Sequence, residues 1–474
     1  MKKKFFMIQK IRLLILAGTM ILFAGCAKKW LELEPKSEVS ADVLLQTPEG
    51  FSIALNGIYT SLSSYTLYGG ELTHGMVDVL ARCYDLKNTT QYDQLKNYDY
   101  VSAGMDQRIN SIWALAYSTI ANCNALLEEM NKKDDGFFRE HERARLEGEL
   151  LTIRAMLHFD LLRLYAPAPV VGDGTAIPYY TALSNVPMPE RPTSEILQLI
   201  ITDLTRSKQV QRDFDTRLDA KESFQGFRFR FYNDPTFYGP DKRGFRMGYY
   251  ATTALLSRVA LYAGDNQLAR ENAMEVINDE TGDKGATVSF TPATIINVGE
   301  YDRLLSEDLI FALYRQRYEK DFNKVTFLMA NASQIFGADL NFDYRKKCYL
   351  TNDGRQLLKF DTTQDREGNI TSAIPMIRLS ELYHIAAETL YDSDPDGALD
   401  LLNTLRTKRG CSFPLSPMPD KSAFEDAVIN DARREFTGEG KLFFLYKRLN
   451  KTILDETNGN QALTDKFVLP VTEK

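Results

Sequence analysis

The sequence predicts a mainly α-helical protein, built as a tetratricopeptide-like helix-turn-helix scaffold with long irregular loop insertions and minor β structure. Two observations lead to this class. Apolar residues recur at spacings of three and four along most of the 474 residues, which is the pattern of amphipathic helices. Two pairs of such segments also share one turn arrangement, as expected of stacked repeats that bury a common core.

The first 26 residues predict a lipoprotein export signal. Basic residues Lys2 to Lys4, Lys10 and Arg12 precede an uncharged, mostly apolar run from Leu13 to Gly25, which stops at Cys26. The run is shorter than the ~20 residues that a membrane span needs. Cleavage before Cys26 leaves its thiol for acylation, and two or more acyl chains make membrane attachment stable. An ordinary secretory signal with an incidental cysteine is the alternative.

The helices are justified in order along the chain. Two long segments, 109–130 and 146–164, each carry one apolar stripe and are expected to bury one face. The first stripe includes Trp113. The remaining predicted helices are 51–62, 194–206, 251–262, 269–276, 376–390, 398–405 and 422–436.

Two of these pairs resemble each other at their turns. Tyr262 closes one helix, Gly264 and Asp265 form the turn, and Ala269 opens the next helix seven residues after the tyrosine. Leu390-Tyr391 is followed by Ala398 in the same arrangement. A small residue early in the second helix lets the partner helix approach closely. No strict 34-residue period runs through the chain, so the likeness to tetratricopeptide repeats is loose.

Three long interruptions separate the helices, at residues 63–104, 211–248 and 279–373. They are rich in aromatic, Gly, Asp and Asn residues without helical spacing, and loops on a rigid scaffold commonly carry function. Tyrosine suits a ligand site because its face stacks on apolar surfaces while its hydroxyl tolerates water. Packing beneath the loops is the alternative for these rings. The candidate ligand-binding residues are Asp78, Arg82, Tyr84, Tyr98 and Tyr100, with Phe237 and Tyr238 as a second location.

Catalytic signatures are missing from the sequence. There is no GxSxG, Walker loop or GxGxxG, and Arg145 stands where a zincin beginning at His141-Glu142 requires its second histidine. His158 and His384 fall within predicted helices and are assigned to the core or helix surface. We therefore expect a protein that is not an enzyme and needs no cofactor or metal. Carboxylates are too numerous for glycosidase chemistry to be excluded by counting.

Charge and cysteine content narrow the function further. The net charge is −7, and loss of five basic residues with the leader leaves the mature chain near −12, which argues against nucleic acid as a partner. The acidic turn at Asp392, Asp394 and Asp396 resembles half of a calcium loop, but Asn403 occupies the position of the bidentate glutamate. We therefore expect these aspartates to cap the following helix.

The remaining cysteines are Cys83, Cys123, Cys348 and Cys411. The spacing specifies no disulfide among them, and Cys123 lies on an apolar stripe, where a buried thiol is expected.

Short motifs spread over about 400 residues resemble the SusD/RagB family of outer-membrane lipoproteins from Bacteroidota. The C-terminal part is most similar. The motifs are Leu31-Glu32-Leu33-Glu34-Pro35, Leu55-Asn56-Gly57-Ile58-Tyr59, Trp113 with Tyr117, Glu147-Gly148-Glu149 with Arg154-Ala155, Arg378 to Tyr383, Arg406 with Arg409-Gly410, and Arg433-Arg434-Glu435-Phe436 with Gly438-Glu439-Gly440 and Lys447-Arg448. The chain departs from the family at Ala432 and Leu445, where Arg and Asp are usual, and it lacks the usual acidic cluster after Cys26.

The resemblance implies a function. Such proteins sit as a lid over a SusC-like TonB-dependent transporter, capture a glycan or peptide, and deliver it to the barrel. It further implies a lipid-anchored outer-membrane location, probably at the cell surface, with a signal peptide at 1–25, an anchor and tether at 26–45, an N-terminal SusD-like region at 46–280 and a C-terminal SusD/RagB-like region at 281–474, packed as one body.

Three other functions stay open beside the glycan-binding lid. One is a peptide-binding lid, because the chain has only two tryptophans, Trp30 near the anchor and Trp113 on a helical stripe, so a sugar platform walled by tryptophan is not expected. The second is a surface glycan hydrolase, and the third is a purely structural repeat protein. A hydrolase needs a carboxylate pair in a cleft, and a structural module lacks a concave aromatic site.

Overall fold

We describe the computed structural model of the protein over residues 41–85, 90–215, 243–279, 290, 303–316, 318–322, 329, 332–360, 372–453 and 466–471. Cys26, Phe237 and Tyr238 lie outside these described residues. The chain divides into two units, Met1–Phe51 and Ser52–Lys474. Among the described residues, no helix has the length and apolarity required to cross a membrane.

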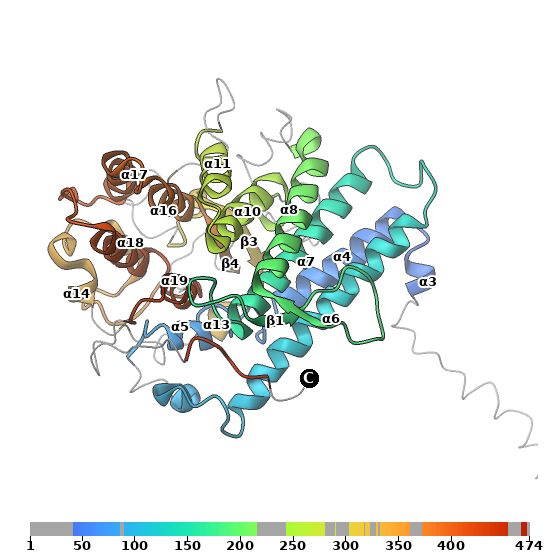
Figure 1. Ribbon diagram of the computed structural model, residues 1–474, viewed down its shortest axis with the longest axis horizontal. Coiled ribbons are helices and arrows are strands. Elements are labelled where there is room, and N and C mark those ends of the chain that lie inside the picture. The colour runs from blue at the N-terminus through green and yellow to red at the C-terminus, as the bar shows by residue number, and fades with distance from the viewer. Residues whose placement is uncertain are drawn as a thin grey trace, which may run out of the picture. The chain divides into compact units, whose positions relative to one another are not determined.

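Helices account for most of the described chain, as predicted. Figure 1 shows them in order of colour. The α-helices are α3 (Ala41–Leu44), α4 (Pro48–Leu62), α5 (Met76–Leu80), α6 (Met105–Asn131), α7 (Glu142–Tyr165), α8 (Thr193–Asp215), α10 (Tyr249–Ala263), α11 (Asn266–Ile277), α13 (Tyr318–Asp321), α14 (Ala332–Phe336), α15 (Tyr344–Tyr349), α16 (Leu379–Leu390), α17 (Pro395–Lys408), α18 (Lys421–Glu435) and α19 (Leu442–Leu449).

Short strands form two antiparallel pairs. β1 (Thr175–Pro178) pairs with β2 (Glu190–Pro192), and β3 (Leu309–Tyr314) pairs with β4 (Ala373–Arg378). Strand β4 replaces the first turn of the helix predicted at 376–390, so that helix begins at Leu379 instead. All six residues of β4 are buried, and a strand buried on both faces has a continuous apolar run that periodicity cannot distinguish from a helix.

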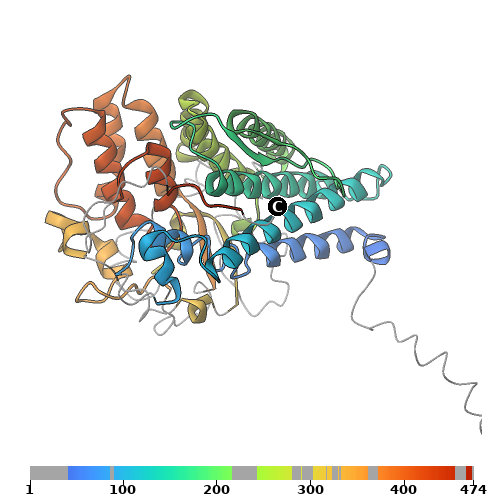
Figure 2. The ribbon, with the colours of Figure 1, turned by 60° about the horizontal axis from the view of Figure 1, so that its bottom comes forward.

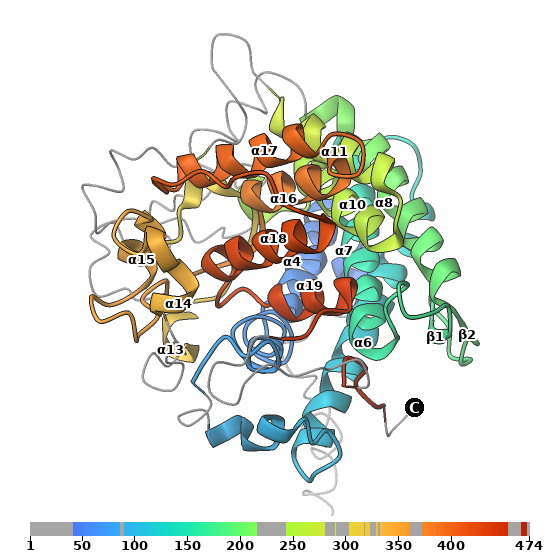
Figure 3. The same cartoon turned by 60° about the vertical axis from the view of Figure 1, so that its left-hand side comes forward.

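The scaffold is a succession of helices in which each packs against the next. The order is α6, α7, α8, α10, α11, α16 and α17, and Figure 3 shows α11, α16 and α17 beside one another with α8 and α10 adjacent. Helix α7 departs from the prediction of one apolar stripe, because all of its residues from Gly148 onward are buried. Neighbours on several sides explain this, since α6, α8 and α10 all contact it. Figure 2 shows α6 and α7 as two long neighbouring helices.

Both predicted helix-turn-helix pairs are present, and the second helix of each pair is capped by an aspartate. Gly264 ends α10 in the left-handed region at φ 82°, which glycine adopts without steric cost. Asp265 Oδ1 accepts a hydrogen bond from the backbone N–H of Leu268 at 3.0 Å and caps α11. Asp394 Oδ1 accepts from the Gly397 N–H at 2.9 Å and caps α17. The capping interpretation of Asp394 is therefore confirmed.

Helix α19 and the predicted third loop differ from expectation. Residues 279–373 were expected to be irregular, yet they contain β3 and the short helices α13, α14 and α15. Helix α19 was not predicted, although it includes the family motif Lys447-Arg448. Its Lys447 is buried and donates through Nζ to the carbonyls of Arg163 and Phe467, at 2.5 and 2.6 Å. Such backbone partners satisfy a lysine inside an apolar helix.

An ionic core explains the charged residues of the C-terminal family motifs. Arg345 is fully buried and forms ion pairs with Asp343, Asp431 and Glu435 at 2.7, 2.9 and 2.9 Å. Arg409 also pairs with Glu435, at 2.5 Å. Burial alone raises the pKa of Glu435, but these two guanidinium groups hold it well below its usual range. The motif residues therefore serve the scaffold, since buried charges persist only when paired.

Candidate ligand-binding site

The five candidate residues described by the structure lie in the interior. We call them the Asp78 cluster: Asp78, Arg82, Tyr84, Tyr98 and Tyr100. Each side chain belongs to a residue less than a tenth exposed. Asp78 contacts Tyr84, and Arg82 contacts the Tyr98 ring. Both contacts lie inside the core and not on an accessible surface. This burial contradicts the expectation that the segment presents open aromatic faces.

Asp78 binds the C-terminal part of the chain. Its carboxylate accepts from the backbone N–H groups of Gly438 at 2.6 Å and Gly440 at 3.1 Å, and from the Tyr84 hydroxyl at 3.4 Å. Burial raises the pKa of Asp78 to about 7, against the lowering effect of the Gly438 hydrogen bond. Gly440 has φ 68°, and a Cβ there would lie 2.1 Å from the Leu72 carbonyl oxygen. The contact therefore requires glycine.

The contacts of Arg82, Tyr98 and Tyr100 stabilise the irregular segment to which these residues belong. The Arg82 guanidinium donates to the carbonyls of Leu95 and Lys96 at 3.0 Å and lies 4.0 Å from the centre of the Tyr98 ring. The Tyr100 hydroxyl donates to the Lys466 carbonyl at 2.6 Å. These groups satisfy carbonyls of an irregular segment that has no regular ladder of its own. Their geometry favours a structural role.

A different aromatic surface is accessible. It is a groove of about 570 Å³ between α6 and residues 178–190, which we call the α6 groove. Trp113 and Tyr117 of α6 form one wall, and Tyr180 and Met188 lie in the other. The volume and apolar lining are typical of a small-ligand site. Ser118, Asn185 and Glu190 supply polar groups along it.

Aromatic rings run continuously along the groove. The Trp113 and Tyr117 ring centres are 4.8 Å apart, and those of Tyr117 and Tyr180 are 5.6 Å apart in an edge-to-face arrangement. Tyr165 of α7 packs edge-on against Trp113 at 5.0 Å. Such pairs fix ring orientation beyond what area burial alone supplies. The prediction placed Trp113 on the buried stripe of α6. In the structure Trp113 lies beside that stripe and is only partly buried.

The second wall is tied to the scaffold by hydrogen bonds. Tyr117 donates to the Pro178 carbonyl at 2.9 Å. Asn124 Nδ2 donates to the carbonyls of Tyr180 and Ala182 at 3.1 and 3.2 Å. Tyr180 accepts at its hydroxyl from the Met188 N–H at 3.1 Å. The groove is therefore largely formed before any ligand arrives, which lowers the entropic cost of binding.

His158 and Arg154 support this wall from α7. His158 Nε2 accepts from the Tyr180 N–H at 3.1 Å, its Nδ1 lies 2.9 Å from the Arg154 carbonyl, and its ring stacks on Tyr179 at 3.9 Å. Burial lowers the pKa of His158 to about 3, so the imidazole is neutral. Arg154 donates to the Thr181 carbonyl at 3.0 Å and forms an ion pair with Asp203 at 2.7 Å. The assignment of His158 to the core is confirmed.

Tyr180 and Trp113 were missed for identifiable reasons. Tyr180 lies in a segment with no helical or strand periodicity, and Trp113 shares its spacing with the true stripe. The buried face of α6 includes Ile109, Ile112, Ala116, Cys123 and Met130. One feature of the sequence did indicate the groove. Trp113 and Tyr117 are four residues apart and therefore lie on the same side of the helix, which makes the apolar face wider than one buried stripe.

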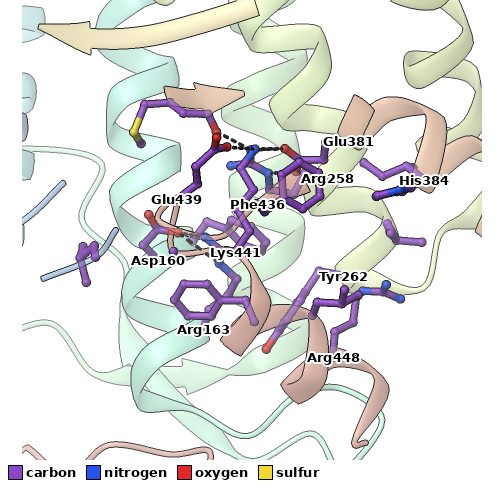
Figure 4. Close-up of a pocket in the computed structure, with 18 of the residues that line it drawn as sticks. Asp160, Arg163, Arg258, Tyr262, Glu381, His384, Phe436, Glu439, Lys441 and Arg448 are labelled. Atoms are coloured by element: carbon purple, nitrogen blue, oxygen red, sulfur yellow. Dashed lines mark hydrogen bonds and ion pairs between the residues drawn. The ribbon is translucent and has the colours of Figure 1, made fainter. Parts of the chain in front are cut away.

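A second cavity lies deeper, among α7, α10, α16 and α19. It holds about 100 Å³ and is shown in Figure 4, where Arg258 and Glu381 point toward one another. Glu381 pairs with Arg258 at 2.5 Å and Lys441 at 2.9 Å. Burial opposes ionisation of Glu381, yet these two cations hold its pKa well below the usual range. A permanently ionised carboxylate is a poor proton donor, so this cavity offers no general acid at Glu381.

Metal and thiol chemistry find no support in the described residues. No group of three or more His, Cys, Asp or Glu there is arranged to hold a metal ion. Among the described residues, Cys83, Cys123, Cys348 and Cys411 form no disulfide with one another. Cys123 is buried, as expected, and burial raises its pKa to about 12. A thiol in this state is unreactive.

Comparison with known proteins identifies the family. Residues 29–214 match a SusD-like family model described as starch-binding associating with outer membrane, and residues 318–467 match the SusD family model. A SusD-like protein of Bacteroides ovatus is 21% identical over 196 residues, which is 41% of this chain and 34% of that protein. SusD-like protein P2 of Formosa agariphila is 24% identical over 278 residues, 57% of this chain and 46% of that protein. The matches thus span less than half the length of these relatives.

Solved structures share the fold. A SusD superfamily protein from Bacteroides thetaiotaomicron has a TM-score of 0.64 at 20% identity, covering 90% of this chain and 96% of its own. A putative sugar binding protein from Bacteroides vulgatus has a TM-score of 0.67 at 21% identity, covering 90% and 95%. At this identity the likeness concerns the fold alone. Together with the family models and the tetratricopeptide-like helical scaffold, it confirms the resemblance found in the sequence: the chain belongs to the SusD family.

Proposed function

We propose that this protein is a lipid-anchored outer-membrane binding protein that captures a glycan in the α6 groove and passes it to a SusC-like TonB-dependent transporter. Membership of the SusD family supports a nutrient-binding role without catalysis. The leader ending at Cys26 supports the anchor. The observation that carries the proposal is the continuous ring run of Trp113, Tyr117 and Tyr180 along a preformed groove.

Aromatic faces suit sugars for a physical reason. The C–H groups on one face of a pyranose are apolar and pack on a ring, while the hydroxyls around its edge need polar partners. Ser118, Asn185 and Glu190 lie along the groove to provide them. A peptide with apolar side chains is the alternative occupant, and one experiment separates the two.

The test is an array of glycans and peptides probed with the purified protein and with its Trp113→Ala variant. We expect glycan signals that disappear in Trp113→Ala and persist in the control Tyr100→Phe, which loses the hydrogen bond from its hydroxyl to the Lys466 carbonyl. Signals confined to peptides would refute the glycan proposal. Glycan signals that survive Trp113→Ala would place the site outside the groove.

The anchor and the partner are tested separately. Cys26→Ala should release the protein from membranes of cells that lack the transporter, because the acyl chains carry the hydrophobic attachment. Retention of that variant would contradict the anchor. Pull-down of the native protein from gently solubilised membranes should recover a TonB-dependent barrel protein, and its absence would contradict the partnership.

A further inference from the structure

The α6 groove is lined without a positive charge. Among the described residues that form it, none is lysine or arginine, and the acidic residue is Glu190. Glu190 is exposed, and its charge raises the pKa of Tyr117 after the larger effects of burial and Tyr180. The carboxylate therefore acts on the middle of the ring run.

A second carboxylate, outside the lining residues, contacts the 178–190 wall from α6. Glu128 of α6 accepts from the backbone N–H of Leu183 through Oε1 at 2.7 Å. Leu183 is 52% exposed and Val186 70% exposed, so this wall is an apolar rim that carries a fixed negative group at one end. An anion here finds no counter-charge among the lining residues.

Two arginines close to this wall in sequence or structure form ion pairs within the protein. Arg154, behind the wall, gives its donors to Asp203, Asn124 and the Thr181 carbonyl. Arg191, next to Glu190, forms an ion pair with Glu195. Neither arginine is among the residues that line the groove, and transfer of an unpaired anion to an apolar site is strongly unfavourable.

We infer that the α6 groove selects neutral glycans and rejects glycans that carry carboxylate or sulfate groups, with Glu190 as the residue that sets this selectivity. The inference rests on the proposed function, since it names the ligand class of the same site. Selection against anions needs only the absence of cations and one carboxylate near the ring run, and both are present.

The experiment measures binding to the native protein by calorimetry with two sets of probes. The neutral set is maltohexaose, cellohexaose, xylohexaose and mannohexaose, and the anionic set is hexagalacturonate and a chondroitin sulfate hexasaccharide. We expect at least one neutral probe to bind at least about tenfold more tightly than either anionic probe. Raising the salt concentration should narrow this gap, because salt screens repulsion between exposed charges.

Glu190→Lys tests the residue directly. It should strengthen binding of the anionic probes several-fold relative to binding of the best neutral probe. Asp135→Lys is the matched control, because it makes the same charge change at an exposed position beyond the C-terminal end of α6. The control should alter neither set.

The possible failures are distinct. An anionic probe that binds the native protein as tightly as the neutral set, and is lost in Trp113→Ala, overturns the selectivity while the proposed function stands. Equal effects of Glu190→Lys and Asp135→Lys overturn the role of Glu190. No binding of any sugar, with peptides binding instead, overturns the proposed function and the inference together.

Discussion

The Asp78 cluster and the α6 groove contain the same kinds of residue in opposite settings. In the cluster, Tyr98 and Tyr100 are buried. Asp78 and Arg82 form hydrogen bonds with backbone groups, Asp78 with a distant segment and Arg82 with a neighbouring one. In the groove, Trp113 and Tyr117 lie on a regular helix yet line an accessible surface. The comparison indicates that an irregular segment uses its aromatic side chains for its own packing. A helix with a wide apolar face can bury one part of that face and leave other aromatic rings accessible to a ligand.

The largest expected effect is a loss of stability on mutation of the Asp78 cluster, with no loss of ligand affinity. Asp78→Ala leaves the buried N–H groups of Gly438 and Gly440 without their acceptor, so we expect a loss of about 3 kcal/mol in the free energy of unfolding. Guanidinium unfolding followed by circular dichroism measures it. Ligand affinity of the folded variant should be unchanged. Intact stability with lost affinity would reverse the comparison and return the Asp78 cluster to the binding site.

The next expected effect is a loss of glycan affinity on mutation of the α6 groove. Trp113→Ala should weaken glycan binding about tenfold or more, equivalent to about 1.4 kcal/mol, because an aromatic anchor at the centre of a groove dominates binding. Isothermal titration calorimetry measures the change. Tyr98→Ala is the matched control, since it removes a ring of the Asp78 cluster and should lower stability while affinity stays the same. The opposite assignment of the two losses would contradict the account.

A pH dependence of stability sharpens the difference further. Burial raises the folded-state pKa of Asp78 from 3.8 to about 7, so between these values the folded protein keeps a proton that the unfolded chain has released. The stability contributed by protonated Asp78 is present at acidic pH and lost as pH rises through 7. We expect Asp78→Asn to cost less at pH 8 than at pH 5, by about 2–3 kcal/mol.

Thermal unfolding of both proteins across this range checks the sign. A larger cost at pH 8 would mean that the carboxylate is the form the fold prefers. Glycan affinity should stay constant over the same range, because His158 behind the groove, with a pKa of about 3, remains neutral throughout.

The smallest effect concerns the capped turn. Asp394→Ala should lower stability by about 0.5–1 kcal/mol, because the N–H of Gly397 loses its cap. Neither calcium nor a chelator should change the melting temperature of the native protein. A stabilisation by calcium that Asp394→Ala abolishes would restore the metal interpretation of this turn.

The sequence allowed the helices to be predicted because their spacing is local information. The turns at Gly264 and Asp394 were predictable for the same reason. The role of Asp78 was not, because its partners Gly438 and Gly440 are about 360 residues away along the chain. Trp113 was misassigned because a residue one position from a buried stripe has nearly the same periodicity, and only the placement of residues 178–190 reveals the surface that it faces.

The most direct test of the central claim uses the scarcity of tryptophan. The chain has two, Trp30 and Trp113, so the full-length Trp30→Phe protein reports fluorescence from the groove alone. We predict that a glycan which binds this protein changes its tryptophan emission in a saturable manner, with the same dissociation constant as calorimetry. Binding detected by calorimetry with no change in Trp113 emission would contradict the assignment of the ligand to the α6 groove.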